Sequence, residues 1–144
     1  MDGNRELLNF IYQNSQMGII SIKQLFEVVP DMDEKFHRQI ESQMKEYQKI
    51  NAEARKLLEE NGCDEKGLGA LEKIRTYLMI DFQTMADKGV SHLAEMMLMG
   101  STMGIVNATR NLRKYQNVKK EIHSLMEDLL KFEDDNFQKL REFL

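Results

Sequence analysis

Apolar residues recur along the chain at intervals of three and four positions, the spacing of one face of an α-helix. Four stretches with this pattern cover about residues 4–29, 34–61, 90–115 and 118–143. Pro30 ends the first stretch, because the residue before a proline disfavours helical backbone. Asp31 or Asp33 can cap the second, and Asn61-Gly62 is a typical stop at its end. The pattern predicts four long helices.

One face of each predicted helix supplies the expected core. Its apolar members and one glutamate, in chain order, are Leu7, Ile11, Ile22, Leu25, Val29, Phe36, Ile40, Tyr47, Ala54, Leu58, Ile122, Met126, Leu129, Leu130, Glu133, Phe137, Leu140 and Leu144. On the third helix the shared face is His92, Met96, Met99, Gly100, Met103 and Asn107. The run from Met96 to Met99 makes that helix apolar around much of its circumference. Such a helix is covered on all sides, either by this chain or by a second subunit, and we expect a homodimer.

Residues 62–89 connect the two halves, and Leu68 to about Asp87 has a helical pattern of its own. Gly89 interrupts this pattern, and Ser91 can cap the third long helix. A helix that continues through Gly89 is the alternative, because an isolated glycine costs only about 1 kcal/mol. A helical connector of this length spans about 30 Å, close to the length of the bundle.

Residues 1–58 align without a gap to residues 87–144, and the clearest match is Ser15–Ile19 against Ser101–Ile105. Repeats of this kind set the architecture. We interpret the chain as one domain, 1–144, with a hairpin at 1–61, a crossover at 62–89 and a hairpin at 90–144. The helix order is then up-down-down-up, and a five-helix up-and-down arrangement is the alternative.

Composition narrows the class of protein. The chain has 144 residues and a formal net charge of −4, with one proline and no tryptophan. The acidic balance argues against non-specific nucleic-acid binding, which needs a basic field. No apolar run is long enough to cross a membrane, and from the polar N-terminus we expect no signal peptide. The single cysteine, Cys63, is expected in an exposed loop, and the predicted compartment is the cytoplasm.

Together with the Met-Gly-Ile turns at Met17 and Met103 and the run Ser91-His92-Leu93-Ala94-Glu95-Met96-Met97, this organisation resembles the ferritin-like four-helix bundles. It is most similar to small, uncharacterised bacterial members of that superfamily. The resemblance implies an all-α bundle of two helical hairpins joined by a helical crossover. It also implies a test for a metal site.

Ferritin-like metal proteins carry a glutamate on each of two helices and Glu-x-x-His on each of the other two. Here the first helix has no inward carboxylate, and the third has the reversed order His92-Leu93-Ala94-Glu95. The fourth helix has Glu133 but Asn136 in place of the histidine. The remaining candidate ligands for Fe, Mn or Zn are Glu95, His92, Glu133 and Glu46. For Glu46 and Glu95, surface salt bridges are the simpler interpretation.

Glu133 is centred on an apolar face, where a charge is costly unless it is paired or bound. It replaces Tyr47 of the other copy, and we expect Tyr47 to donate a hydrogen bond to it. A proton or metal role for Glu133 is the alternative. Gly18 and Gly104 are expected to allow close contact between the first and third helices.

The pairs His37/Glu41 and His123/Glu127 have the spacing of helix neighbours, and we expect ion pairs on the flanks of the helices.

The sequence is consistent with three functions. The first is a non-enzymatic scaffold or interaction protein that self-associates and needs no cofactor. The second is a degenerate metal-binding bundle in metal handling or oxidative-stress protection. The third is a ligand-binding bundle, which predicts an apolar pocket between Met96, Met103, Tyr47 and Phe137. No nucleophile elbow, phosphate-binding loop or zinc cysteine set supports catalysis.

Overall fold

The computed structural model describes residues 3–63 and 85–144, and these residues form four long helices. They are α1 (Gly3–Val28), α2 (Glu34–Glu60), α4 (Val90–Lys114) and α5 (Lys120–Arg141). The all-α prediction is confirmed for this part of the chain, and each helix begins and ends within about two residues of its predicted bounds. The crossover expected at 62–89 falls mostly outside the described residues.

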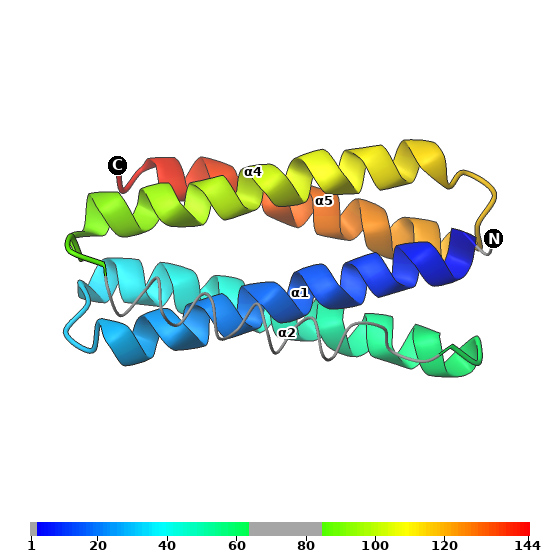
Figure 1. The fold of residues 1–144 in the computed structure, drawn as a ribbon, viewed down its shortest axis with the longest axis horizontal. Helices are drawn as coiled ribbons and strands as arrows, with labels where there is room; N and C mark the ends of the chain where they lie inside the picture. Colours follow the sequence, from blue (N-terminus) through cyan, green and yellow to red (C-terminus); the bar gives the residue numbers. More distant parts are fainter. Residues whose placement is uncertain (1–2, 64–84) are drawn as a thin grey trace.

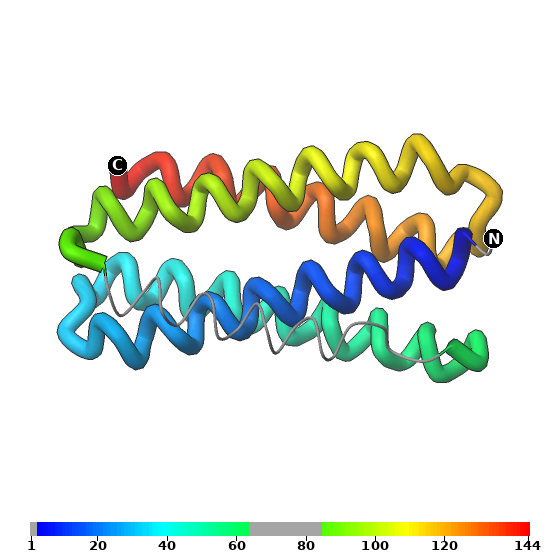
Figure 2. Tube along the Cα trace, in the orientation of Figure 1, coloured from blue at the N-terminus to red at the C-terminus, as the bar shows by residue number. Residues whose placement is uncertain are grey.

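The helices lie side by side along one axis and form two hairpins (Figures 1 and 2). Helix α1 packs against α2, and α4 packs against α5. The hairpins also contact each other, mainly where α1 faces α5 and α2 faces α5. Helix α2 ends at the opposite end of the bundle from the start of α4, so α2 and α4 run in parallel (Figure 1). The up-down-down-up and five-helix interpretations differ only in residues 64–84, outside the described part.

The first turn between helices follows from local chemistry. Helix α1 stops two residues before Pro30, as predicted. Asp33 then caps α2, because its carboxylate accepts a hydrogen bond from the Phe36 amide at 3.0 Å. At the other end of the bundle, α4 begins at Val90 after non-helical residues 85–89, so the predicted break at Gly89 is confirmed. Gly89 itself is the N-cap, and Ser91 makes no cap.

The end of α2 corrects one prediction about Cys63. Gly62 has φ +66°, and the amides of Gly62 and Cys63 donate to the carbonyls of Glu59 and Leu58, at 3.1 and 2.8 Å. This pair of bonds is the Schellman motif, in which the residue after the glycine turns back over the helix. Cys63 is therefore buried, with 8% of its surface exposed, rather than lying in an exposed loop.

The core consists of two apolar clusters, one in each half of the bundle. One cluster includes Leu8, Ile11, Leu58, Ile122 and Leu129. The other includes Ile22, Leu25, Phe36, Ile40 and Leu93. Buried polar side chains lie between them, near the middle of the helices: Ser15, Gln43, Ser101, Glu133 and Asn136. This central polar layer separates the two clusters. Leu144, which we expected in the core, is instead 61% exposed, because it lies beyond the end of α5 at Arg141.

The expected core face of α4 is wrong. The side that α4 buries is Leu93, Ala94, Leu98, Ser101, Gly104 and Ala108. Met99 and Met103 instead expose 65% and 59% of their surface. The sequence pattern was ambiguous because both sides of α4 are apolar. On the buried side, Gly104 lies against α5, where a Cβ would be 3.2 Å from Glu133 Cδ, whereas Met99 and Met103 lie largely exposed.

Candidate functional site

A tyrosine–glutamate pair lies at the centre of the bundle. The Tyr47 hydroxyl on α2 donates to Glu133 Oε1 on α5 at 2.6 Å, and Asn14 Nδ2 on α1 donates to the same oxygen at 3.3 Å. Glu133 exposes only 1% of its surface. The hydrogen bond predicted from the aligned positions is confirmed, and it joins the two hairpins. The second oxygen, Oε2, has no hydrogen-bond partner among the described residues.

Two glycines make room for this pair. A Cβ atom at Gly18 would lie 2.6 Å from the Tyr47 ring, and one at Gly104 would lie 3.2 Å from Glu133 Cδ. The atoms nearest to each glycine thus belong to a side chain of the adjacent hairpin helix. We expected the glycines to bring α1 and α4 together, and this expectation is wrong. The absence of a Cβ instead lets large side chains cross the helix at mid-bundle.

Neighbouring side chains hold the tyrosine and the helix beside it. The Tyr47 ring packs edge-on against Phe132, with 4.8 Å between ring centroids and an angle of 80°. One turn further along α2, Asn51 Nδ2 donates to Ser15 Oγ and to the Tyr12 carbonyl, both at 3.1 Å. The buried Ser15 hydroxyl donates back to the Ile11 carbonyl at 2.7 Å. These bonds fix α1 against α2 next to the pair.

Burial dominates the ionisation of both groups. It raises the pKa of Glu133 above the ordinary glutamate value. The hydrogen bonds from Tyr47 and Asn14 lower this pKa again only in part, as does the nearby Ser101 hydroxyl. Ser101 does not complete a hydrogen bond of ordinary geometry to Oε2. Burial, followed by the negative charge of Glu133, raises the pKa of Tyr47 well above 10. The pair therefore favours a protonated tyrosine and an increased neutral fraction of the carboxyl group.

We expect the stability of the protein to fall as pH rises above the ordinary glutamate pKa near 4.5. The folded state binds the Glu133 proton more tightly than the unfolded state does. The stability that this proton contributes is complete below the pKa of Glu133 in the unfolded chain. It is lost as pH rises through the higher pKa of Glu133 in the folded protein, at roughly 1.4 kcal/mol per pH unit between the two. Urea unfolding of the wild type and of Glu133→Gln across a pH series measures this slope.

The glutamine variant should lack that part of the pH dependence. Glu127→Gln is the matched control, since Glu127 is an exposed carboxylate on the same helix. Equal slopes in the wild type and Glu133→Gln would contradict a raised pKa at Glu133.

A cavity of about 320 Å³ lies between α1 and α4 with this pair in its lining. Its apolar wall is formed by methionines and one leucine: Met17, Leu25, Met96, Met97 and Met103. Asn14, Ser21, Ser101 and Asn107 add polar atoms, and the remaining lining residues are glycines with Tyr47 and Glu133. The pocket predicted between Met96, Met103, Tyr47 and Phe137 thus exists with three of its four residues. Glu133, one turn before Phe137, lines it instead.

The four predicted metal ligands do not converge. His92 and Glu95 lie on the first two turns of α4, exposed, with 4.0 Å between Nδ1 and Oε2. Glu133 is buried at mid-bundle, and Glu46 is exposed on α2. Within residues 3–63 and 85–144, no group of three or more His, Cys, Asp or Glu side chains is arranged to hold a metal ion. The described part of the chain therefore offers no shared site for Fe, Mn or Zn.

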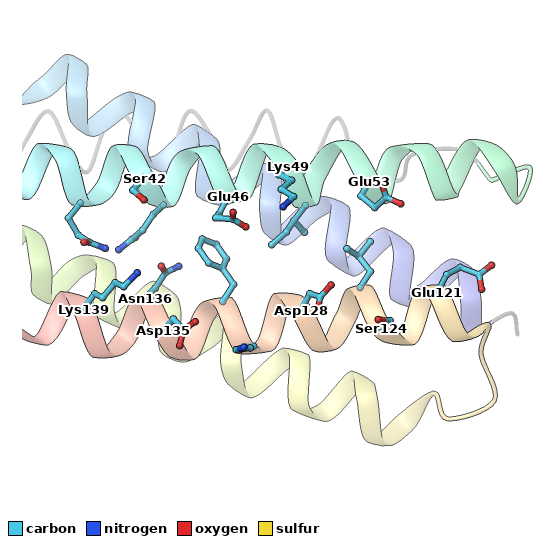
Figure 3. Close-up of a pocket in the computed structure, with 16 residues that line it drawn as sticks. Ser42, Glu46, Lys49, Glu53, Glu121, Ser124, Asp128, Asp135, Asn136 and Lys139 are labelled. Carbon is cyan, nitrogen blue, oxygen red and sulfur yellow. The ribbon is translucent and has the colours of Figure 1, made fainter.

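Glu46 lines a different feature, a groove of about 650 Å³ between α2 and α5. Figure 3 shows it on α2, facing α5, where Asp128 and Asp135 lie on either side of it along the groove. Lysines from both helices share this groove, among them Lys49 and Lys139. The alternating charges are those of an ordinary solvated surface between two amphipathic helices.

The repeated histidine pairs lie on the flanks, as predicted. His37 Nδ1 is 3.7 Å from Glu41 Oε2, and His123 Nδ1 is 3.0 Å from Glu127 Oε1. All four side chains are about 40% exposed or more. Exposed pairs of this kind contribute little to stability, on the order of 0–1 kcal/mol.

Sequence reasoning missed several members of the site, among them Asn14, which donates to Glu133, and the cavity-lining residues Met17 and Ser101. Met17 and Ser101 are aligned with Met103 and Ser15, and that correspondence was the available signal for these two. None of the helices in the described ranges is long and apolar enough to cross a membrane. Comparisons of the chain with protein-family models, curated proteins and solved structures give no significant match.

Proposed function

We propose that this protein is a non-enzymatic helical-bundle scaffold that self-associates through α4. The observation that carries the proposal is a row of apolar side chains along that helix, Met96, Met99, Met103 and Val106, of which Met96 is partly buried and, like Met103, also lines the cavity between α1 and α4. Met99, Met103 and Val106 expose 65%, 59% and 37% of their surface. Successive members are three, four and three positions apart, the spacing of a coiled-coil seam. We call this row the α4 seam.

The charges beside the seam favour a second copy of the same chain as its partner. Exposed Glu95 lies beside the start of the seam and exposed Arg110 lies one turn beyond its end. An antiparallel pair of α4 helices, related by a two-fold axis, places each glutamate near the arginine of the other copy.

The finer fold assignment is part of the same proposal. We assign the bundle to the ferritin-like architecture, built from two repeated hairpins. Support comes from the parallel course of α2 and α4 and from the helix bounds. Adding 86 to the bounds of α1, 3–28, gives 89–114, and α4 spans 90–114. The Tyr47–Glu133 bond joins two positions with the same separation of 86.

Metal handling, the alternative function, has no comparable support among the described side chains. The predicted ligands lie apart, and the buried carboxylate of Glu133 is engaged by Tyr47 and Asn14. Catalysis likewise has no grouping of reactive side chains in its favour there. The scaffold proposal therefore rests on the exposed α4 seam and its flanking charges.

We expect Met99→Glu to convert a dimer into a monomer. Burying a glutamate in an apolar interface is costly, and the two-fold axis doubles the effect. Sedimentation equilibrium of the wild type and the variant measures the dissociation constant, which should rise at least tenfold. Gln48→Glu is the matched control, because it adds the same charge at an exposed position of α2. A monomeric wild type, or equal weakening by both variants, would contradict the proposal.

Charge reversal tests the antiparallel register separately. Glu95→Arg or Arg110→Glu alone should weaken association, since each creates two like-charge contacts. The double variant should restore it, because the exchange recreates the opposite-charge pairs. Additive weakening in the double variant would exclude this register.

A further inference from the structure

The cavity between α1 and α4 has the properties of a small-molecule site. Its volume of about 320 Å³ is at the lower end of the range for ligand pockets. Methionines form most of its apolar wall, and their flexible, polarisable side chains adapt to different shapes. Such pockets usually contain few polar groups, which fix the orientation of the ligand. Here those groups are the Tyr47–Glu133 pair and the amides and hydroxyls beside it.

The cavity lining contains a buried carboxylate oxygen, Glu133 Oε2, that has no hydrogen-bond donor among the described residues. Glu133 is the only charged residue among the described residues of the cavity wall, and none of them is Lys, Arg or His. Its Oε1 atom accepts from Tyr47 and Asn14, whereas Oε2 is buried without a donor. A buried polar atom without a partner costs free energy, and an ionised one costs more. A ligand that brings a cationic donor supplies this partner, and an anionic ligand would be repelled.

We infer that the cavity binds a small primary amine as its ammonium ion, with the N–H groups donating to Glu133 Oε2 and the apolar body packing against Met17, Met96, Met97 and Met103. A saturated, unbranched amine suits a wall of this kind, because the wall supplies dispersion contacts but no second charged group. The Tyr47 hydroxyl continues to donate to Oε1. Binding therefore leaves the bond between the two hairpins intact.

The proposed complex makes binding sensitive to pH. An ammonium ion beside Glu133 favours the ionised carboxylate, so binding at low pH releases the carboxyl proton to solvent. Titratable groups that act on Glu133 are Tyr47 from α2 and Asp134 from α5, while α1 and α4 contribute the neutral Asn14 and Ser101. Affinity should therefore rise with pH until Glu133 is ionised in the free protein.

The direct test is calorimetric titration of the full chain with three probes that share one apolar body: hexylammonium, 1-hexanol and hexanoate. We expect hexylammonium to bind, hexanol to bind at least tenfold more weakly, and hexanoate not to bind. Titration in two buffers of different ionisation enthalpy reports the released proton. Equal binding of hexylammonium and hexanol, or binding of hexanoate, would overturn the proposal, as would failure of all three probes to bind.

Methyl spectra of the methionines locate the site. Hexylammonium should shift the signals of Met17, Met96, Met97 and Met103. It should leave Met126 unchanged, because Met126 is buried in the core cluster in one half of the bundle. Shifts confined to exposed Met99 would place the probe on the surface outside the cavity and overturn the assignment.

Two variants complete the test. Glu133→Gln retains the shape and an acceptor for Tyr47 but removes the charge, and should weaken hexylammonium binding about ten- to a hundredfold. Glu127→Gln, an exposed change on the same helix, should not. If the glutamine variant unfolds, Gly100→Leu serves instead. Gly100 lines the cavity, and a Cβ there meets no atom of the described chain within 4 Å, so a leucine can be accommodated and should weaken binding by taking up cavity volume. Retained binding in the folded variant would refute the proposal.

Met96 and Met103 belong both to the α4 seam and to the cavity wall, so a second subunit on the seam would cover part of the cavity. The monomeric Met99→Glu variant keeps every lining residue of the cavity, because Met99 is not among them. It should bind hexylammonium in the same way whether or not the wild type is a dimer.

Discussion

Replacing Gly18 with alanine is expected to lower the free energy of unfolding by about 1–3 kcal/mol. In most helices the same change is stabilising, because alanine has the higher helix propensity. Here the new methyl carbon would lie 2.6 Å from two carbons of the Tyr47 ring. The ring has little freedom to move, since its hydroxyl is bonded to Glu133 and its edge packs against Phe132. Steric conflict should therefore exceed the gain in propensity.

Gly100→Ala is the matched control for this prediction. Gly100 is also within a helix, but a Cβ there meets no atom of the described chain within 4 Å. We expect that variant to be more stable than the wild type by up to about 1 kcal/mol. Urea unfolding followed by circular dichroism gives both values. If the two substitutions change stability in the same direction, the close approach of Tyr47 to Gly18 is not a constraint on the fold.

Helix positions could be predicted from this sequence because their signals are local. Pro30 and the Asp33 cap define one turn, and Asn61-Gly62 defines the end of α2. The regular spacing of apolar residues between these signals leaves little freedom in the bounds. The Schellman turn that buries Cys63 also has a local signal, but its consequence depends on what lies beneath the turned residue.

The rotation of α4 could not be predicted in the same way. Its apolar residues cover both the inner side, with Leu93 and Leu98, and the outer side, with Met99 and Met103. A periodic pattern defines a face only when the opposite side is polar. Close packing then favours the side with small residues, such as Gly104, which is known only after neighbouring side chains are placed.

The candidate site could be predicted in part because Glu133 is a charged residue on an otherwise apolar helix face. Glu133 occupies a core position, and a buried carboxylate needs a partner. The aligned Tyr47 supplied that partner. The proposed ligand set failed to assemble because three members, His92, Glu95 and Glu46, were placed by helical spacing alone. Spacing gives the direction of a side chain around one helix but not its distance from side chains on another.

Replacing Tyr47 with phenylalanine is expected to lower the free energy of unfolding by about 1–3 kcal/mol. The ring that fills the space above Gly18 remains, so little packing is lost. What disappears is the 2.6 Å donor to Glu133 Oε1, leaving that buried oxygen with only the longer bond from Asn14. Because the tyrosine hydroxyl opposes the rise in the Glu133 pKa, that pKa should rise further in the variant. Tyr115→Phe, at a partly exposed position, is the control and should change stability by less than about 0.5 kcal/mol.

A double-mutant cycle separates this hydrogen bond from other effects of the substitution. In a Glu133→Gln background the oxygen that remains is a neutral acceptor, which loses less than a carboxylate when the donor is removed. Tyr47→Phe should therefore cost less in that background than in the wild type, with a coupling energy of about 0.5–3 kcal/mol. Additive losses would mean that the two side chains stabilise the bundle independently. In that case, the contact between the hairpins at mid-bundle would be held by packing rather than by the tyrosine–glutamate bond.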